Sequence, residues 1–245
     1  MHLLGVFLFL NLTACGKHSL CAAKGPVVTR RYELDNVHTL ITGMHMHVTL
    51  TADDKNSMTV SGPENMIRMF RWSLRKDTLK LETEKNCIFR DPDAALQIDI
   101  RLRDLRIVRN SGEYAIVSDG PLPFDSLVLI SENAIDPSSP AVGDFDLEIR
   151  NTSLTVVSNN MSLFRLRGST RSLFVGFYAG LSRFEGQDLQ ADRIGFIHKS
   201  ANDMLFFPVH KIDGDLYSTG NAVLFHEPEI ENIRRHYTGQ IIRAY

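Results

Sequence analysis

Residues 159–166 read NNMSLFRL, a pair of asparagines that suits a tight turn and then the short run Leu163-Phe164-Arg165-Leu166. Small or turn-forming pairs of this kind recur through the second half of the chain, at successive spacings of 22, 26, 20, 22 and 19 residues. They are Ser111-Gly112, Asn133-Ala134, Asn159-Asn160, Ala179-Gly180, Ala201-Asn202 and Gly220-Asn221. The longest interval contains the turn-rich segment Asp136-Pro137-Ser138-Ser139-Pro140, which we interpret as a loop insertion. The chain therefore carries an internal repeat of about twenty residues.

A cycle of about twenty residues, with short strands and a tight corner, is typical of one coil of a parallel β-solenoid. Asparagine and small residues suit the corners because they tolerate positive φ. A β-sandwich is the competing interpretation, since its turns recur every 8 to 12 residues or so. The whole unit repeats at double that spacing, which favours an all-β parallel β-helix or solenoid over residues 111–245.

The first half of the chain alternates apolar and polar residues with period two, which indicates half-buried strands. In residues 44–51 one face is Met, Met, Val and Leu, and the other is His, His, Thr and Thr. Residues 97–103 likewise place three aliphatic side chains on one face. We therefore expect a β-meander over residues 27–110.

A hairpin is predicted within this part of the chain. Residues 70–74 and 78–81 read as its two strands, joined by Arg75-Lys76-Asp77. A short irregular or helical bridge is expected just before it, at Glu64 to Met69.

Composition limits the class of protein. The 245 residues are 43% hydrophobic, enough to bury a substantial core. Lys plus Arg number 27 and Asp plus Glu number 29, so no overall charge favours nucleic acid as a partner. The sequence contains no P-loop, dinucleotide fingerprint or G-x-S-x-G element, and we expect no cofactor and no metal.

The leader indicates a compartment. Residues 3–10, LLGVFLFL, are too short to span a bilayer but suit the apolar region of a secretory signal. The next residues, Leu12-Thr13-Ala14-Cys15, resemble the bacterial lipobox, whose cysteine is acylated and becomes the first residue of the mature chain. We therefore predict a lipoprotein signal peptide at 1–14, with lipid-bearing Cys15 and a tether at 15–26. An ordinary cleaved signal with a chance cysteine is the alternative. Whether Cys21 and Cys87 pair is left open.

Several residues are candidates for binding or chemistry. Arg101 and Arg103 lie on one outward strand face, where arginines can bind carboxylate or phosphate through a bidentate fork; a solubilising strand face is the alternative. His45 and His47 stand about 7 Å apart on one strand face and offer two metal ligands, but no third is identified.

Acidic clusters and aromatic residues are the remaining candidates. Asp91-Pro92-Asp93, Asp144-Phe145-Asp146 and Asp213-Gly214-Asp215 suit turns, and would suggest hydrolysis only if carboxylates from different elements framed a cleft. Nine aromatic residues of the repeat region are expected to fill a solenoid core, although any that point outward could stack on sugars. They are Phe164, Phe174, Phe177, Tyr178, Phe184, Phe196, Phe206, Phe207 and Phe225.

The order of several segments carries a family resemblance. The run from Val60 to Ile67, the strand Thr78-Leu79-Lys80-Leu81, the recurrent corner pairs and the closing Leu216 to Asn221 followed by Pro228 together resemble the auto-transporter adhesin head GIN domain. That family comprises bacterial secreted and lipid-anchored proteins of unknown function. The resemblance spans about residues 28–230, and members usually have Ser-Gly or Gly-Ser corners where this chain partly has Asn or Ala. It implies an all-β, right-handed β-helix-like body, with residues 27–245 as one continuous domain.

We therefore expect a lipid-anchored protein of the bacterial cell envelope, facing the periplasm or the cell surface. Its expected role is non-catalytic binding or adhesion, with polysaccharide or another envelope protein as partner. The alternatives are a polysaccharide lyase or hydrolase, because β-helices host such enzymes, and a structural subunit of an envelope complex.

Overall fold

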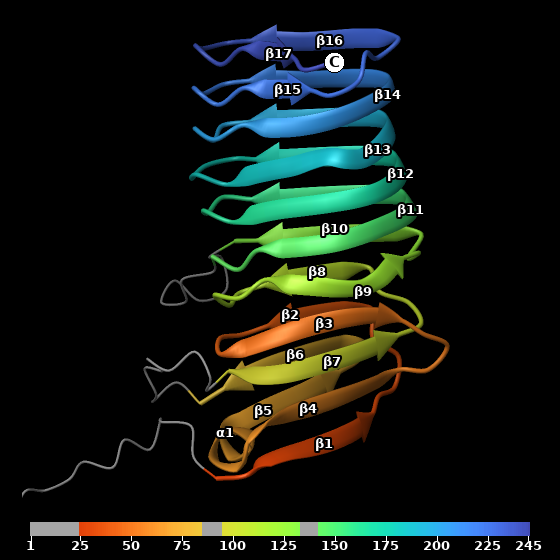
Figure 1. Ribbon diagram of the computed structural model, residues 1–245, viewed down its shortest axis with the longest axis vertical. Coiled ribbons are helices and arrows are strands. Elements are labelled where there is room, and N and C mark those ends of the chain that lie inside the picture. Colours follow the sequence, from red (N-terminus) through yellow and green to blue (C-terminus); the bar gives the residue numbers. More distant parts are fainter. Residues whose placement is uncertain (1–24, 85–94, 133–141) are drawn as a thin grey trace, which may run out of the picture.

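The computed structural model describes residues 25–84, 95–132 and 142–245 (Figure 1). Several predicted features lie outside the described residues: the signal peptide, Cys15, Cys21, Cys87, the Asp91-Pro92-Asp93 cluster, the Asn133-Ala134 pair and the loop at 136–140.

Strands make up nearly all of the regular structure, so the expectation of an all-β protein is confirmed. The first strands are β1 (Val27–Glu33), β2 (Thr39–Thr42), β3 (Met46–Ala52), β4 (Ser57–Pro63), β5 (Phe70–Arg75), β6 (Thr78–Thr83), β7 (Leu96–Leu102), β8 (Ile107–Asn110), β9 (Ile116–Leu122) and β10 (Ser126–Ser131). They are followed by β11 (Phe145–Ser158), β12 (Leu163–Phe177), β13 (Arg183–His198), β14 (Met204–Leu216), β15 (Ala222–Leu224), β16 (Ile230–Arg235) and β17 (Ile241–Arg243). A short helix, α1 (Glu64–Met69), occupies the predicted bridge.

The four long strands β11 to β14 are stacked in parallel. Phe145 lies opposite Phe164, Phe164 opposite Phe184, and Phe184 opposite Met204, which are steps of 19, 20 and 20 residues. The sequence repeat of about twenty residues is therefore the step from one strand to its neighbour. The corner pairs from Asn159-Asn160 to Ala201-Asn202 fall in the connections between these strands, and Gly220-Asn221 falls between β14 and β15. These connections line up along one edge of the stack (Figure 1).

Each long strand bends in its middle, so the 17-stranded sheet curls into two parts (Figure 1). The part that we call sheet I contains, in order, β1, β4, β7, β3, β9, the first halves of β11 to β14, β15 and β17. The part that we call sheet II contains β5, β6, β2, β8, β10, the second halves of β11 to β14, and β16.

The first half of the chain differs from the predicted β-meander. Only the predicted hairpin, β5 with β6, joins consecutive strands among β1 to β9 in the described residues. Strand β3 instead pairs in parallel with β7 and β9, and β2 pairs in parallel with β6 and β8. Alternation of apolar and polar residues identifies the strands, but it does not predict which strands pair with each other. The observed pairing extends both sheets and so buries the apolar faces of both.

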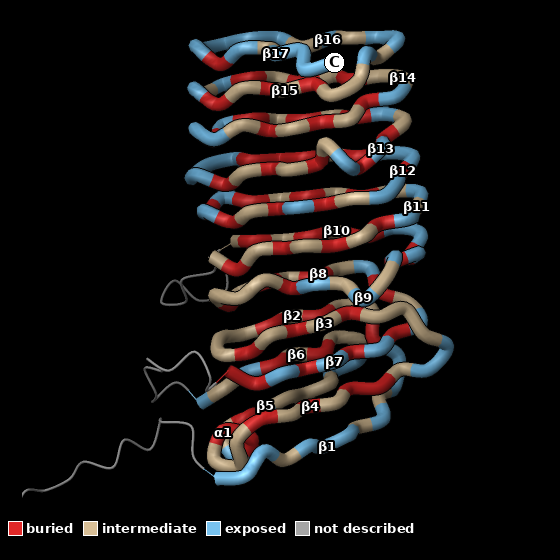
Figure 2. Tube along the Cα trace, viewed as in Figure 1, coloured by how far each residue is buried: buried red, intermediate tan, exposed pale blue. Residues whose placement is uncertain are grey.

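One core runs through the stack between the sheets. Inward residues of both strand halves are buried, such as Leu147 and Ile149 in sheet I and Leu154 and Val156 in sheet II. Buried and partly exposed positions therefore alternate along the strands (Figure 2). Phenylalanines in register stack from step to step, with the ring centroids of Phe145 and Phe164 5.0 Å apart.

The aligned corners are lined inside by polar residues. Ser131, Ser158, Ser162, Ser182 and Ser200 are all buried. The hydroxyl of Ser158 lies 2.7 Å from that of Ser182, and the Ser200 hydroxyl donates to the Ser182 carbonyl over 2.7 Å. These bonds satisfy polar groups that would otherwise be costly to bury, and they tie each corner to the next.

Candidate functional site

A shallow polar hollow of about 340 Å³ lies on the outer face of sheet I. It spans strands β1, β4, β7, β3 and β9, which come from distant parts of the sequence. Its lining residues are Arg31, Thr49, Thr51, Asp53, Lys55, Ser57, Thr59, Asp99, Arg101 and Asp119.

Strand register assembles the hollow. Thr49 on β3 lies opposite Asp99 on β7, and Asp99 lies opposite Thr59 on β4. Thr59 in turn lies opposite Arg31 on β1. Their inward neighbours Val48, Ile98 and Val60 are buried in the core. Because side chains alternate along a strand, burying one set fixes the other on the outer face.

The hollow is balanced in charge and rich in hydroxyl groups. Three basic residues, Arg31, Lys55 and Arg101, face three acidic residues, Asp53, Asp99 and Asp119. Within the described part of the chain, Asp99 and Asp119 make no ion pair and the hydroxyls of Thr49, Thr51 and Thr59 make no hydrogen bond. These donors and acceptors are available to a polar ligand.

The two arginines predicted to bind a ligand have different positions. Arg101 lines the hollow, and its Nη1 lies 3.1 Å from Asp53 Oδ2. The hydrogen bond from Arg101 lowers the pKa of Asp53 below its ordinary value. Arg103 is not among the residues that line the hollow: its Nε and Nη2 donate to the Asp54 carbonyl over 3.0 and 2.7 Å, so it holds the turn between β3 and β4.

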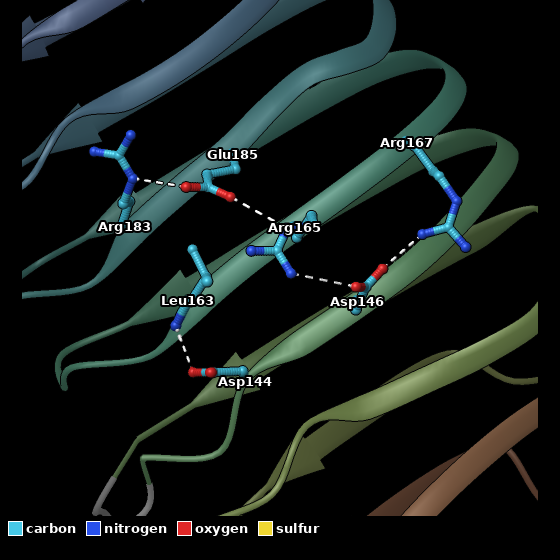
Figure 3. A network of polar contacts seen from close by, with 7 residues as sticks. All are labelled: Asp144, Asp146, Leu163, Arg165, Arg167, Arg183 and Glu185. Carbon is cyan, nitrogen blue, oxygen red and sulfur yellow. Dashed lines mark hydrogen bonds and ion pairs between the residues drawn. The ribbon is translucent and has the colours of Figure 1, made fainter.

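A network of ion pairs continues along the outer face of sheet I (Figure 3). Asp146 on β11 accepts from Arg165 over 3.4 Å and from Arg167 over 2.6 Å, both on β12. Glu185 on β13 lies between Arg165, at 3.2 Å, and Arg183, at 2.9 Å. The hydrogen bond from Asp146 and the charge of Glu185 raise the pKa of Arg165. This part of the face holds its charges in closed pairs, whereas the hollow also contains Asp99 and Asp119, which make no ion pair within the described residues.

The two acidic clusters that fall within the described residues do not meet in a cleft. Asp144 and Asp146 belong to sheet I, where Asp144 Oδ1 accepts from the Leu163 amide over 2.7 Å. Asp213 and Asp215 lie in the second half of β14, in sheet II. Hydrogen bonds from Lys211 lower the pKa of Asp213, and those from Arg234 and His236 lower that of Asp215. A general acid in glycoside hydrolysis needs a raised pKa, so Asp213 and Asp215 give the hydrolase alternative no support.

The two histidines considered as metal ligands, His45 and His47, have separate partners. His45 Nδ1 lies 2.9 Å from Glu113 Oε1. Burial alone would raise the pKa of Glu113, but hydrogen bonding and charge from His45 outweigh it and lower that pKa. The His47 ring packs on Tyr114 with ring centroids 4.1 Å apart. Among residues 25–84, 95–132 and 142–245, no group of three or more His, Cys, Asp or Glu side chains is arranged to hold a metal.

The nine aromatic residues of the repeats divide between the core and the outside. Phe164, Phe177, Phe184, Phe196 and Phe206 are buried, as predicted for the majority. Phe174 is half-buried on the outer face of sheet II, and Tyr178 is exposed at its edge. Phe207 stacks on His226 with ring centroids 4.9 Å apart.

Sequence reasoning missed most of the hollow. The polar face of residues 44–51 was recognised, but Asp99, Asp119 and Thr59 were not linked to it. The available signal was alternation, which predicts that each points outward. What the sequence lacked was the partner of each strand, and therefore the register that brings these residues together.

A curled all-β stack with an open, charge-balanced hollow defines the class of protein: one that presents an extended surface for binding. Residues 38–228 match the family described as "Putative auto-transporter adhesin, head GIN domain". The chain therefore belongs to this family, as the resemblance predicted. No curated protein matches the chain.

Solved structures share this fold. A "putative adhesin" from Bacteroides fragilis has a TM-score of 0.81 and 19% identity, covering 90% of this chain and 98% of its own. A "putative lipid binding protein" from Parabacteroides distasonis has a TM-score of 0.68 and 14% identity, covering 91% and 98%. A "putative adhesin" from the same organism has a TM-score of 0.63 and 10% identity, with the same coverage.

The family is one of adhesin-like proteins, which indicates a bacterial envelope or surface protein with a binding role. In the part of the chain that the structure describes, none of the helical structure has the length and hydrophobicity of a membrane span.

Proposed function

We propose that this protein is a lipid-anchored, non-catalytic binding protein of the bacterial envelope, and that it contacts polysaccharide through the hollow on sheet I. We further propose that its stacked strands form a parallel β-solenoid. Such a scaffold is rigid along its length and suits an extended ligand without a deep pocket.

The hollow is the observation that carries the proposal. A neutral sugar offers many hydroxyl groups and little net charge, and it is bound by precisely placed polar groups. Asp99 and Asp119 supply acceptors with no ion-pair partner in the described residues, and Thr49, Thr51 and Thr59 supply hydroxyls that both donate and accept. A closed ion-pair surface such as that around Asp146 would first have to break its own contacts.

Arg101 and Arg103 keep distinct parts in this proposal. Arg101 lies in the hollow beside Asp53, where it can donate to a ligand hydroxyl or carboxylate. Arg103 contacts the Asp54 carbonyl and so positions the turn that carries Asp53 and Lys55.

Binding is tested with a glycan array. The probe is the full chain carrying Cys15→Ala, so that no lipid contributes to retention. The proposal predicts a signal on neutral polysaccharide that persists when salt is raised, because the charges of the hollow balance. A silent array overturns polysaccharide as the ligand class. Shortening of a bound glycan during incubation would instead support the lyase or hydrolase alternative.

The anchor is supported by the sequence alone, through Leu12-Thr13-Ala14-Cys15 after an apolar leader. Several acyl chains on one cysteine give stable anchoring, since each buried CH₂ contributes about 0.8 kcal/mol. Cys15→Ala should move the protein from the membrane fraction to the soluble fraction. Cys21→Ala is the matched control and should leave it with the membrane. A Cys15→Ala protein that stays with the membrane contradicts the anchor.

A further inference from the structure

The outer face of sheet II is apolar, in contrast to that of sheet I. Two adjacent columns of outward positions run across β2, β8, β10, β11, β12 and β13, which pair in this order. The first column begins at the polar Thr39 on β2, which we leave out of the apolar set, and continues through Ile107, Val128, Thr155, Phe174 and Gly195. The other column holds Ile41, Arg109, Ile130, Val157, Gly176 and Ile197. We call these eleven residues, without Thr39, the apolar strip.

The strip points away from the core. The residues between its members, such as Val108, Leu129 and Val156, are buried. Strip side chains are half-buried because they pack on one another across a flat sheet. Phe174 lies over Gly195, where an added Cβ would stand 3.4 Å from the ring, and Tyr178 lies over Gly176. Both rings are therefore laid along the sheet rather than standing up from it.

Charge is nearly absent within the strip. Its single ionised side chain is Arg109, whose Nη1 lies 3.6 Å from Glu132 Oε2. Just beyond the two ends lie ion-paired strands: β6 carries Lys80 with Glu82, and β14 carries Lys211 with Asp213. An apolar centre depleted of charge, with polar groups around it, is the anatomy of an interface between protein subunits.

The strip is self-complementary about a two-fold axis that lies along the strands between β10 and β11. That axis sets Ile41 of one copy opposite Ile197 of the other, and Ile130 opposite Val157. It sets Arg109, the one charged member, opposite Gly176, which is covered by the Tyr178 ring, so the guanidinium would meet an aromatic face. Beyond the ends it sets Lys80 on β6 opposite Asp215 on β14, but Lys80 is already paired with Glu82, and Asp215 with Arg234 and His236, within the same copy.

The area is sufficient for a modest dimer. Six strands at about 4.8 Å spacing span about 29 Å. Two apolar columns and the neighbouring polar column of Ser126, Ser153 and Ser172 span about 20 Å at about 6.6 Å per outward residue. The polar column covers only β10 to β13, where it ends at the exposed Arg193, so the footprint is about 510 Å² per copy, or about 1,020 Å² in total, at the lower limit for specific interfaces.

We propose that the apolar strip is a homodimer interface and that its occupant is a second copy of this chain. Six strip side chains are aliphatic and Thr155 offers the one hydroxyl group, so the strip has few groups to bind sugar hydroxyls, although Phe174 and the neighbouring Tyr178 present rings. The dimer leaves both hollows on sheet I facing outward, so two sites would be available to one polysaccharide.

Sedimentation velocity of the full chain carrying Cys15→Ala, under reducing conditions, tests the interface. We expect a concentration-dependent dimer. Val157→Arg, at the centre of the strip, should raise the dimer dissociation constant at least about tenfold. Thr49→Arg makes the same kind of change at a half-buried outward position of sheet I, and should leave the dimer intact. If Val157→Arg fails to fold, Thr155→Arg serves instead: Thr155 is a half-buried outward position of the strip, so the new charge should weaken the dimer, and Thr49→Arg is its matched control.

Three results would overturn the proposal. One is a monomer over about a hundredfold range of concentration. Another is a dimer that Thr49→Arg abolishes and that the sheet II variants leave intact. The third is a monomer that floats with phosphatidylglycerol vesicles unless Val157 is replaced, which would assign the strip to a membrane. None of these outcomes depends on glycan binding by the hollow, so the two proposals can fail separately.

Discussion

Acid should destabilise the fold through one buried histidine, His198. Its side chain lies at the inner edge of the stacked corners, where Nδ1 accepts from the Ser200 amide over 3.3 Å and Nε2 has no hydrogen-bond partner. The His198 ring packs against the backbone of Gly220, because a Cβ added to that glycine would stand only 2.6 Å from Nε2. Burial lowers the pKa of His198 from 6.5 to about 4, because the charged form is poorly solvated there.

The magnitude follows from linkage between proton binding and folding. Below pH 6.5 the unfolded chain takes up a proton on His198, whereas the folded chain does so only near pH 4. The contribution of the neutral His198 side chain to the free energy of unfolding is therefore fully present above pH 6.5, and it is lost as the pH falls to about 4. At 1.36 kcal/mol per pH unit, the gap of about 2.5 units corresponds to about 3 kcal/mol.

The assay compares the protein with His198→Leu in urea denaturation between pH 7 and pH 4. Leu216 occupies the same register position on the next strand, so leucine fits this column. Other titrating groups cancel in the difference between the two proteins. That difference should shift by about 3 kcal/mol in favour of the variant on acidification. The control His210→Gln replaces a half-exposed histidine that is paired with Glu229, and it should lose stability in acid as the parent does. A difference that does not change with pH would refute the reasoning.

Three further substitutions test the packing. Gly168→Ala should lower the free energy of unfolding by at least about 2 kcal/mol in urea titrations, since φ is +105° and the new Cβ would stand 2.1 Å from the Ile149 carbonyl. The control is Gly120→Ala, where φ is +82° and no atom lies within 4 Å of the new Cβ; it should lower the free energy of unfolding by about 1 kcal/mol. If the two substitutions destabilise the protein equally, the close contact at Gly168 contributes nothing. Ser182→Ala should cost about 1 to 3 kcal/mol by the same assay, because it removes the hydroxyl that bonds the buried Ser158 hydroxyl, and a neutral result would show that the corner ladder adds nothing. Asp146→Asn should cost under about 1 kcal/mol, because its arginine partners are largely exposed, and a large fall in melting temperature would contradict that view.

Parts of the fold were accessible from sequence because they depend on local pattern. The turn pair Asn159-Asn160 and the run after it predicted the step length, which the register of Phe145, Phe164 and Phe184 reproduces. The hairpin of β5 and β6 was predicted for the same reason, since its two strands are adjacent in the chain and share one short turn.

The arrangement of β1 to β9 was not accessible in this way. The alternation of Met46, Val48 and Leu50 identifies a strand with one buried face, but it fits antiparallel and parallel partners equally. Strand β3 pairs with β7 and β9, across gaps of dozens of residues, because that pairing extends the stack and covers its core. The hollow depends on these pairings and so could not be predicted.

The candidate site likewise has a part that local sequence pattern predicts and a part that it does not. Arg101 was singled out for its outward position and does line the hollow. Arg103 shares that pattern in the sequence, yet its guanidinium is used by the Asp54 carbonyl. Alternation in the sequence predicts which way a side chain points. Whether its hydrogen-bonding groups are free depends on the turns that surround it in the structure.

The most direct test of the central claim is glycan binding by variants of the hollow. Asp99→Leu and Thr59→Val remove an acceptor and a hydroxyl from exposed or half-exposed positions, so the fold should persist. Asp188→Leu changes an exposed acidic residue farther along sheet I and is the control. The account predicts that both hollow variants weaken binding to the array-positive glycan at least about tenfold and that the control binds as the parent does. Undiminished binding by Asp99→Leu and Thr59→Val together would contradict it.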